Sequence, residues 1–427
     1  MVFMSQWKSC LHSNTYTINS YDAMGMCSFY LLFIGICALL FIIVILLFGD
    51  LPNYRDTILN KLHHILVENF FKFITNKLQQ FDNTYLNSSL TSQKGKLRLK
   101  WLFGWTVPIL YLIIFTKCLK LFFDYTYTQI IKYEETLQSP TNWGLRYWFV
   151  IIPLIIINYV TFLLAVFSDP GVIGPKRECN FNTSQLQAEF PNDGILFPPE
   201  IVCSTCKIKK PPRSKHCSSC DRCVLMFDHH CIWLNNDVGY YTFRWFFLFL
   251  CSICIIFVYG GYLSFYSLQV YLKSGNIPEN INKASTPKKY WRLIKQTTVG
   301  NEITGILLLL CLLLFPLIGY FLVETTWSIY LGVTTNEIGK WNYINELINH
   351  DLVYQFDPED GSAKVYLILT ERLPGGQGKF MALSDRSSFN SNIGGSLEPV
   401  KGWDDLKNIY DRGFWLNAKQ KLFPTSF

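Results

Sequence analysis

The chain has 427 residues, of which 50% are hydrophobic and 16% aromatic, and its formal net charge is +7 at pH 7. Several unbroken apolar runs are too long for the core of a soluble domain, so the composition excludes an ordinary soluble protein and predicts a polytopic membrane protein. The loops that flank these runs account for the positive charge, which therefore gives no reason to expect a nucleic-acid partner.

Five segments are apolar enough to cross a hydrocarbon core roughly 30 Å thick, which needs about 20 residues of helix. In chain order they are residues 26–48, 101–123, 147–167, 245–265 and 303–323. The second contains Lys117 and Lys120, whose ammonium groups must reach the membrane surface. A cleaved signal peptide is the competing interpretation of the first. Its apolar run is too long for that and no small-residue cleavage site follows it, so we predict an uncleaved anchor.

Lysine and arginine gather in some of the regions between these segments, a pattern that marks the cytosolic side. Residues 49–100 carry eight, residues 168–244 nine and the tail after residue 332 ten, against one in residues 1–25 and two in residues 124–146. We therefore expect residues 49–100, 168–244 and 324–427 in the cytosol, and residues 1–25, 124–146 and 266–302 in the lumen. The six basic residues between positions 268 and 302 run against this orientation.

Cysteine and histidine are concentrated between the third and fourth segments, where nine of them fall within 29 residues. They are Cys203, Cys206, His216, Cys217, Cys220, Cys223, His229, His230 and Cys231. Thiols stay reduced in the cytosol, which makes a disulfide framework improbable and zinc binding the favoured interpretation. One tetrahedral zinc ion cannot use so many ligands. Some of these residues are therefore available for chemistry.

The block ends in Asp228-His229-His230-Cys231, which allows two interpretations. In the first, Cys231 is a nucleophile. A thiol with an ordinary pKa of about 8.5 is mostly neutral at pH 7, so His229 would accept its proton and Asp228 would orient the imidazole. In the second, all four residues bind zinc or support the loop, and the protein is a non-enzymatic zinc-binding adaptor on a membrane anchor. The tetrapeptide alone does not decide between them.

The tail, residues 324–427, predicts a mixed structure. Alternating apolar residues from Lys364 to Thr370 indicate a strand, and residues 375–395 are rich in glycine, serine and asparagine, which indicates a loop. The expected fold is therefore an all-α polytopic membrane protein with about five transmembrane helices, a small zinc-binding cysteine-rich domain in the cytosol, at about residues 201–244, and a mixed C-terminal tail.

Longer motifs surround the cysteine-rich block. They are Cys203-Ser-Thr-Cys206, Arg213-Ser-Lys-His-Cys217, Cys223-Val-Leu-Met-Phe-Asp-His-His-Cys231, Asn235-Asn-Asp-Val-Gly239, Asp169-Pro-Gly171, Thr334-Thr-Asn-Glu337 and Asn408-Ile-Tyr-Asp411 with Asn417. Together they resemble the DHHC protein S-palmitoyltransferases over about residues 147–420. The Thr-Thr-Asn-Glu and tail motifs are most similar to the fungal spore-wall-formation branch of this family, which acylates SNAREs.

The resemblance implies two interleaved zinc sites. The first is formed by Cys203, Cys206, His216 and Cys223, and the second by Cys217, Cys220, His230 and position 237. The family usually has cysteine at this last position, and the chain has Asp237. A carboxylate is an acceptable zinc ligand, so Asp237 could complete the second site. Two alternatives remain: the site could be weak or empty, or Cys231 could be its fourth ligand.

The resemblance also implies an activity, in which Cys231 takes palmitate from palmitoyl-CoA and passes it to membrane-proximal cysteines of SNARE-like proteins in a ping-pong sequence. The enzyme would reside in the endoplasmic reticulum membrane with a cytosolic active site. Thr334, Thr335 and Glu337 would brace that site, and Tyr410 and Asn417 would tie the tail to the membrane domain. The basic residues Lys207, Lys209, Lys210, Arg213 and Arg222 could contact CoA phosphates, although a solvated cytosolic face explains them equally well.

Overall fold

The computed structural model describes residues 45, 57–65, 103–136, 143–174, 183–197, 201–273, 277, 279–283, 285–359, 364–372, 378–383, 387–389, 395–402 and 405–425. The chain divides into two compact units, Met1–Leu99 and Lys100–Phe427. In the first unit, helix α3 (Ile58–His63) begins after Thr57, whose side chain accepts a hydrogen bond from the Asn60 backbone N–H. The predicted first span lies outside the described residues, apart from Ile45.

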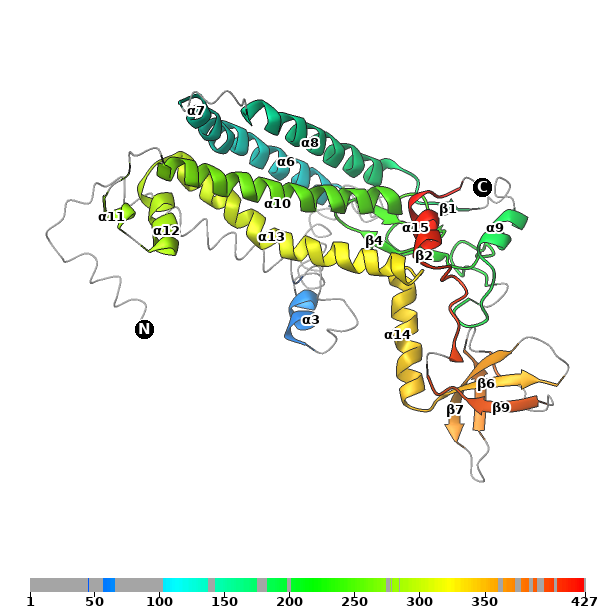
Figure 1. Ribbon diagram of the computed structural model, residues 1–427. Helices are drawn as coiled ribbons and strands as arrows, with labels where there is room; N and C mark the ends of the chain where they lie inside the picture. The colour runs from blue at the N-terminus through cyan, green and yellow to red at the C-terminus, as the bar shows by residue number, and fades with distance from the viewer. Residues whose placement is uncertain are drawn as a thin grey trace, which may run out of the picture. The chain divides into compact units, whose positions relative to one another are not determined.

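Four helices in the described part of the second unit are long and apolar enough to cross a membrane, as a multi-pass membrane protein requires (Figure 1). They cover Thr106–Glu135, Trp148–Phe167, Phe243–Lys273 and Val299–Tyr330, and overlap the second to fifth predicted spans. The first of them consists of α6 (Thr106–Leu121), the π-helix η3 (Phe122–Tyr127) and α7 (Thr128–Thr136). This composite helix continues into the segment that was expected to be a lumenal loop. The reason is that the aromatic residues of η3 pack inside the bundle.

Helix α10 (Phe243–Lys273) packs against α8 (Trp143–Phe167), α13 (Val299–Tyr330) and η3. Polar side chains within these helices bond to one another, because lipid offers no alternative partner. Asn158 of α8 accepts a hydrogen bond from the Tyr111 hydroxyl at 2.8 Å and donates one to Ser252 Oγ at 2.9 Å. This relay joins α6, α8 and α10. Thr126 and Thr304 hydroxyls, 3.0 Å apart, join η3 to α13.

Two short helices connect α10 to α13 at the end of the bundle far from the cysteine-rich segment (Figure 1). They are α11 (Glu279–Asn282) and α12 (Thr286–Gln296). Helix α12 is amphipathic. Leu293 is fully buried on its inner face, and Trp291 is 45% exposed. Arg292 donates a hydrogen bond to the Asn280 carbonyl at 2.7 Å, which ties α12 to α11.

Short antiparallel strands build the segment between α8 and α10. Strands β1 (Val172–Ile173), β3 (Arg222–Val224) and β2 (Lys215–Cys217) form a sheet in that order, and β4 (His229–Cys231) pairs with β5 (Asn236–Val238). Helix α9 (Thr183–Glu189) lies between β1 and β2 in the chain. Strand β1 falls outside the predicted bounds of 201–244, so this domain also uses residues that directly follow α8. Such short strands bury little apolar surface, and a domain of this size usually needs metal ions for stability.

Asn236 fastens this domain to the end of α8. Its side-chain nitrogen donates hydrogen bonds of 2.9 to 3.1 Å to the carbonyls of Ala165, Val166 and Ser168. Carbonyls at the end of a helix lack partners within the helix, so one amide satisfies several of them. Gly239 permits the close approach, because a Cβ at that position would lie 2.5 Å from the Pro170 carbonyl oxygen.

The tail combines helices with a sheet, as expected. Helix α14 (Thr335–Asn349) precedes strands β6 (Val353–Pro358), β7 (Val365–Arg372), β8 (Gly378–Ala382) and β9 (Gly395–Pro399), which form an antiparallel sheet in the order β8-β7-β6-β9, and α15 (Phe414–Leu422) follows. Strand β7 confirms the strand predicted at residues 364–370. The loop predicted for residues 375–395 was partly wrong, because β8 finds its backbone partners on β7, and the glycine-rich composition hides this long-range pairing.

Candidate active site

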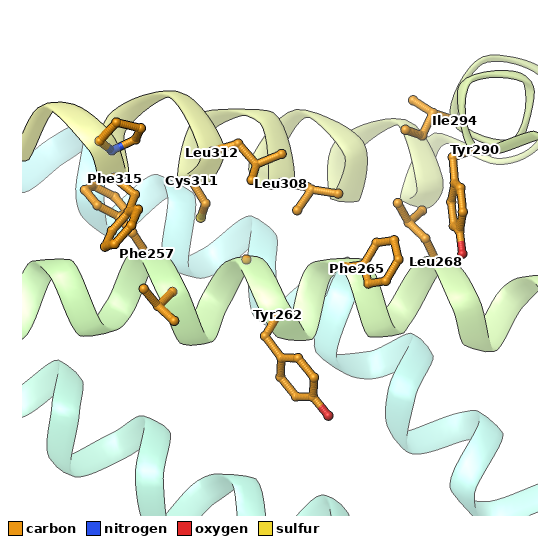
Figure 2. Close-up of a pocket in the computed structure, with 13 residues that line it drawn as sticks. Phe257, Tyr262, Phe265, Leu268, Tyr290, Ile294, Leu308, Cys311, Leu312 and Phe315 are labelled. Atoms are coloured by element: carbon orange, nitrogen blue, oxygen red, sulfur yellow. The ribbon is translucent and has the colours of Figure 1, made fainter. Parts of the chain in front are cut away.

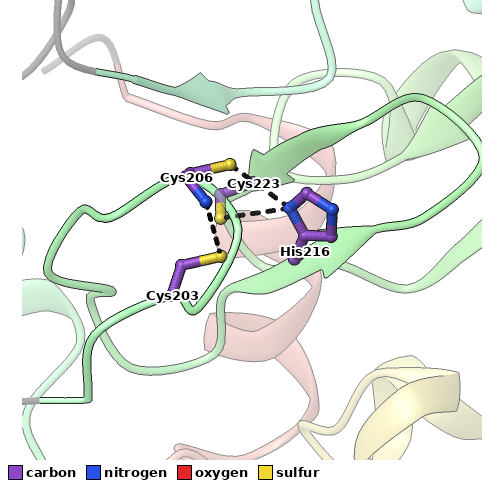
Figure 3. A group of neighbouring side chains, drawn as sticks. All are labelled: Cys203, Cys206, His216 and Cys223. Atoms are coloured by element: carbon purple, nitrogen blue, oxygen red, sulfur yellow. Dashed lines mark hydrogen bonds between the residues drawn. The ribbon is translucent and has the colours of Figure 1, made fainter. Parts of the chain in front are cut away.

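The first metal-binding group consists of Cys203, Cys206, His216 and Cys223, whose donor atoms all lie within 4.8 Å of one another (Figure 3). His216 on β2 and Cys223 on β3 are direct cross-strand partners, so the sheet register brings them together. The other two ligands come from a knuckle in which the Cys206 backbone N–H donates to Cys203 Sγ at 3.3 Å. Three thiols and one imidazole gathered in this way are a ligand set that suits a tetrahedral zinc ion.

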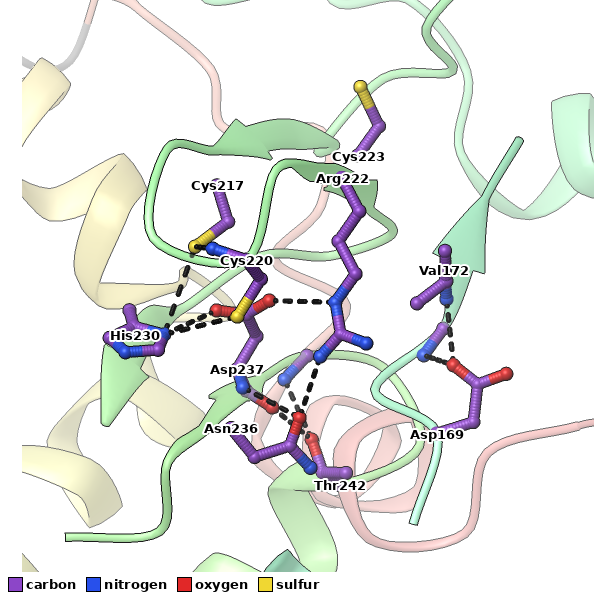
Figure 4. A network of polar contacts seen from close by, with 12 residues as sticks. Asp169, Val172, Cys217, Cys220, Arg222, Cys223, His230, Asn236, Asp237 and Thr242 are labelled. Atoms are coloured by element: carbon purple, nitrogen blue, oxygen red, sulfur yellow. Dashed lines mark hydrogen bonds and ion pairs between the residues drawn. The ribbon is translucent and has the colours of Figure 1, made fainter. Parts of the chain in front are cut away.

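The second group consists of Cys217, Cys220, His230 and Asp237, with donor atoms again within 4.8 Å of one another (Figure 4). His230 on β4 faces Asp237 on β5 in the strand register, and their side chains meet at 2.9 Å between Nδ1 and Oδ1. Burial opposes the charged carboxylate, but hydrogen bonds from His230, Cys217 and Cys220 lower the pKa of Asp237 to about 2. The carboxylate is therefore ionised, as a zinc ligand must be.

Strand geometry separates the two histidines of the tetrapeptide. Successive side chains of a strand point to opposite faces, so His229 and Cys231 share one face of β4 while His230 points to the other. His230 joins the second metal group, and Cys231 belongs to neither group. The alternative in which Cys231 replaces position 237 as a ligand therefore has no support in the geometry. Cys231 is therefore a thiol on the same strand face as His229 that neither metal group uses.

His229 and Asp228 form the pair that the sequence predicts. His229 Nδ1 lies 2.9 Å from Asp228 Oδ2, and Thr335 donates to the same carboxylate from its backbone N–H at 2.9 Å and its hydroxyl at 2.7 Å. Burial works against charge on His229, but Asp228 and Cys231 raise the pKa of this imidazole to about 10. The arrangement can thus supply a nucleophile, a proton carrier and an orienting carboxylate.

Cys231 itself is 7% exposed and lies among apolar residues where the cysteine-rich domain meets α8 and α10. Its cluster includes Phe162 and Ala165 from α8, and Phe243 and Phe246 from α10. The thiol is therefore placed at the boundary between a polar, ligand-rich domain and an apolar helix bundle.

Thr334 and Glu337 form a capping box at the start of α14. The Thr334 hydroxyl accepts a hydrogen bond from the Glu337 backbone N–H at 3.2 Å, and Glu337 Oε2 accepts one from the Thr334 N–H at 2.8 Å. This cap orients Thr335, the next residue, toward Asp228. Of the residues expected from the resemblance to brace the active site, Thr334 and Glu337 therefore cap α14, and Thr335 contacts Asp228.

Comparison with known proteins agrees with this geometry. Residues 197–342 match the family model described as DHHC palmitoyltransferase. The chain is 35% identical to Palmitoyltransferase SWF1 of Candida albicans over 384 residues, which cover 88% of this chain and 94% of that protein. It is 30% identical to Palmitoyltransferase swf1 of Schizosaccharomyces pombe over 400 residues, 92% of this chain and 96% of that protein. The chain belongs to the DHHC palmitoyltransferase family. It is a protein S-acyltransferase.

Arg213 plays a role in this DHHC enzyme that the sequence did not indicate. The expectation that it could contact CoA phosphates was wrong, because the side chain is buried and bonded within the protein. Its Nε and Nη2 donate to the two carboxylate oxygens of Glu337 at 2.7 and 2.6 Å. Nη2 also donates to the Gly332 carbonyl at 2.9 Å, and the guanidinium lies 4.6 Å from the Tyr410 ring centroid. Arg213 therefore joins the cysteine-rich domain, the start of α14 and the tail.

The tail residues predicted to support the DHHC site make buried contacts. The Tyr410 hydroxyl donates to the Pro191 carbonyl at 2.7 Å, and Asn417 Nδ2 donates to the Tyr330 carbonyl at the end of α13 at 3.3 Å. Sequence reasoning missed Lys421 on α15. Its ammonium donates to the Val333 carbonyl at 2.6 Å, and burial lowers its pKa to about 8 although Asp228 opposes the shift. No local pattern distinguishes this lysine from a solvated one.

Asp237 is the position at which this chain departs from the family pattern. We expect Asp237→Cys to keep or raise the zinc content, because the change restores an all-soft donor set at a place where the side chain already faces the other three ligands. Arg222 would lose one partner and keep Asn236 Oδ1 at 2.8 Å. Zinc per chain, measured by inductively coupled plasma mass spectrometry, checks this.

The matched control is Asp237→Ala, which removes the donor altogether and should lower the zinc content by one ion per chain. If Asp237→Cys loses zinc while Asp237→Ala retains it, then position 237 does not face the metal.

Proposed function

We propose that the protein transfers palmitate from palmitoyl-CoA to membrane-proximal cysteines in two steps, through an acyl-enzyme on Cys231. The supporting observation is that His229 and Cys231 share one face of β4 while Asp228, held by two hydrogen bonds from Thr335, bonds to the imidazole. A side-chain set of nucleophile, base and orienting group is the arrangement that thiol acyl transfer requires.

In the first step, Cys231 Sγ, whose proton His229 has already accepted, attacks the thioester carbonyl carbon. The carbon–sulfur bond to CoA then breaks, and the departing thiolate takes the proton from the imidazolium. In the second step, a substrate cysteine gives its proton to His229 and attacks the acyl-enzyme. Cys231 leaves and recovers that proton. Each step exchanges one thioester for another, so no ATP is consumed.

Asp228 keeps the Nδ1 side of His229 occupied, which leaves Nε2 for proton transfer and stabilises the imidazolium. The two metal groups, Cys203/Cys206/His216/Cys223 and Cys217/Cys220/His230/Asp237, would each hold a structural zinc ion. When bound, zinc supplies folding free energy to a domain with little apolar core. His230, as a ligand, fixes β4 and with it the positions of its two neighbours.

The membrane helices provide an apolar environment for the acyl chain of the substrate. Burying an acyl chain is worth about 0.8 kcal/mol per CH₂, so the palmitoyl tail belongs in the bilayer or between helices, while the CoA head stays in water. The Cys231 thiol, which lies in one apolar cluster with Phe243 and Phe246 from the start of α10, meets both. The lysine and arginine bias supports a cytosolic position for residues 49–100, 168–244 and 324–427. Resemblance to the fungal spore-wall-formation branch supports SNARE-like substrates and the endoplasmic reticulum membrane.

The two-step route is tested by giving the purified protein palmitoyl-CoA without an acceptor. We expect release of about one CoA per chain and a palmitoyl group on the Cys231 peptide that hydroxylamine removes, both read by mass spectrometry. Adding a single-span SNARE with a juxtamembrane cysteine should then move the label to that cysteine. CoA release that requires the acceptor, with no acyl group found on the enzyme, would instead indicate direct transfer.

A further inference from the structure

A cavity of about 680 Å³ lies between α10 and α13 and is closed at one end by α12 (Figure 2). Its walls are almost entirely apolar. Residues that line it include Val258 and Phe265 of α10, Tyr290 and Ile294 of α12, and Leu308 and Leu312 of α13. Several of them are open to the surroundings, since Val258 is 55% and Leu312 60% exposed. The cavity is therefore a groove on the surface of two membrane helices.

The groove lies too far from Cys231 to hold the reacting acyl chain. A helix rises 1.5 Å per residue, so the lining residues Phe257 to Leu268 are roughly 21–38 Å along α10 from its first residue, Phe243. The chains of one leaflet span about half of a hydrocarbon core of roughly 30 Å. A palmitoyl chain that starts beside Phe243 would end near the middle of the bilayer. The groove occupies the other leaflet.

Helix α12, which closes one end of the groove, is basic. It carries Lys288, Lys289, Arg292 and Lys295 and contains no acidic residue. Tyr290 and Ile294, one turn apart, reach into the groove, and Trp291 lies beside them with the Lys295 ammonium 5.0 Å from its ring. Aromatic residues combined with lysine are typical of helices that lie at the headgroup level.

An apolar groove and a basic helix at one end of it together fit one kind of molecule, which has an acyl chain and a negative headgroup. We propose that the groove binds an acyl chain of an anionic phospholipid from the leaflet opposite the cysteine-rich domain, and that Lys288 and Lys295 bind its phosphate. This site also accounts for the basic residues of the 268–302 segment, which run against the charge bias of the other loops. Bound lipid bridges α10, α12 and α13.

The test uses the full-length protein in detergent, with phosphatidylglycerol and phosphatidylcholine of identical chains as probes. Native mass spectrometry should show one retained phosphatidylglycerol per chain, bound at least about tenfold more tightly than phosphatidylcholine. Val258→Trp fills the groove and should abolish retention of both lipids. The double variant Lys288→Gln/Lys295→Gln should lower phosphatidylglycerol affinity about tenfold and leave phosphatidylcholine unchanged.

Two control variants share the chemistry but not the position. Ile255→Trp adds the same ring on α10 at a residue that is 52% exposed and does not line the groove. Lys283→Gln removes a charge from the same connecting segment, where Lys283 pairs with Glu279 at 3.3 Å. Both should bind phosphatidylglycerol as the native protein does. Equal retention of the two lipids, or displacement of bound phosphatidylglycerol by palmitoyl-CoA, overturns the proposal; displacement would assign the groove to the substrate chain.

Discussion

Replacing Cys231 with serine will abolish palmitate incorporation into the protein and its substrates while zinc content and fold are retained. A hydroxyl is a far weaker nucleophile than a thiol at neutral pH, and loss of a nucleophile costs roughly three orders of magnitude or more in rate. The metal groups should survive, because Cys231 contributes no donor atom to either of them. Oxygen for sulfur is also a small change in volume, so the buried site should keep its packing.

The measurement combines three readouts on one preparation: hydroxylamine-labile labelling with a clickable palmitate analogue, zinc per chain, and thermal unfolding. Cys254→Ser is the matched control, since Cys254 is a buried thiol of α10 outside both metal groups and outside the tetrapeptide. It should label like the native protein. Persistent labelling of the Cys231→Ser protein would show that another residue is the nucleophile, and loss of one zinc would place Cys231 in the ligand set.

Replacing Arg213 with methionine should destabilise the protein by about 3–5 kcal/mol and greatly reduce acylation. Breaking a buried ion pair leaves its partner charged and desolvated, which is the cause of this large cost. Here the partner is Glu337, whose side chain is 1% exposed and which also caps α14. A displaced cap would move Thr335, and Asp228 would lose the two hydrogen bonds that orient it. Denaturant unfolding and initial acylation rates measure the two effects.

Lys215→Met is the control for this prediction. Lys215 donates to Asn336 Oδ1 at 2.8 Å and so joins the same domain to the same helix, but at an exposed place. Exposed polar contacts contribute at most about 1 kcal/mol, so this variant should stay near native stability. Adding Glu337→Gln to Arg213→Met should recover part of the loss, because the stranded charge is removed. Equal stabilities for the Arg213 and Lys215 variants would mean that the buried ion pair contributes no more to stability than the exposed contact does.

Features that depend on neighbouring residues were predictable. The long apolar runs predicted the membrane helices at residues 106–135, 148–167, 243–273 and 299–330, although the helix ends differ by several residues. Alternation of apolar residues predicted β7. The spacing of cysteines and histidines predicted zinc binding, because ligand pairs within a knuckle are close in sequence as well as in space. The resemblance to the DHHC family divided these ligands into two groups. The ends of helices were harder, since packing and not only hydropathy decides where they stop.

The sequence by itself predicted a membrane-embedded protein with clusters of soft ligands, because composition and motif spacing are local properties of the chain. The resemblance of its motifs to the DHHC family supplied the acyltransferase activity. Only the tertiary structure decided that Asp237 completes the second group of possible metal ligands, and that Cys231 stands outside it on the other face of β4 from His230. It also decided that Arg213 is a buried partner of Glu337, 124 positions away, and not a surface cation. These contacts depend on which distant segments pack together. The residues around a charged side chain in the sequence do not identify the partner that it has in the folded protein.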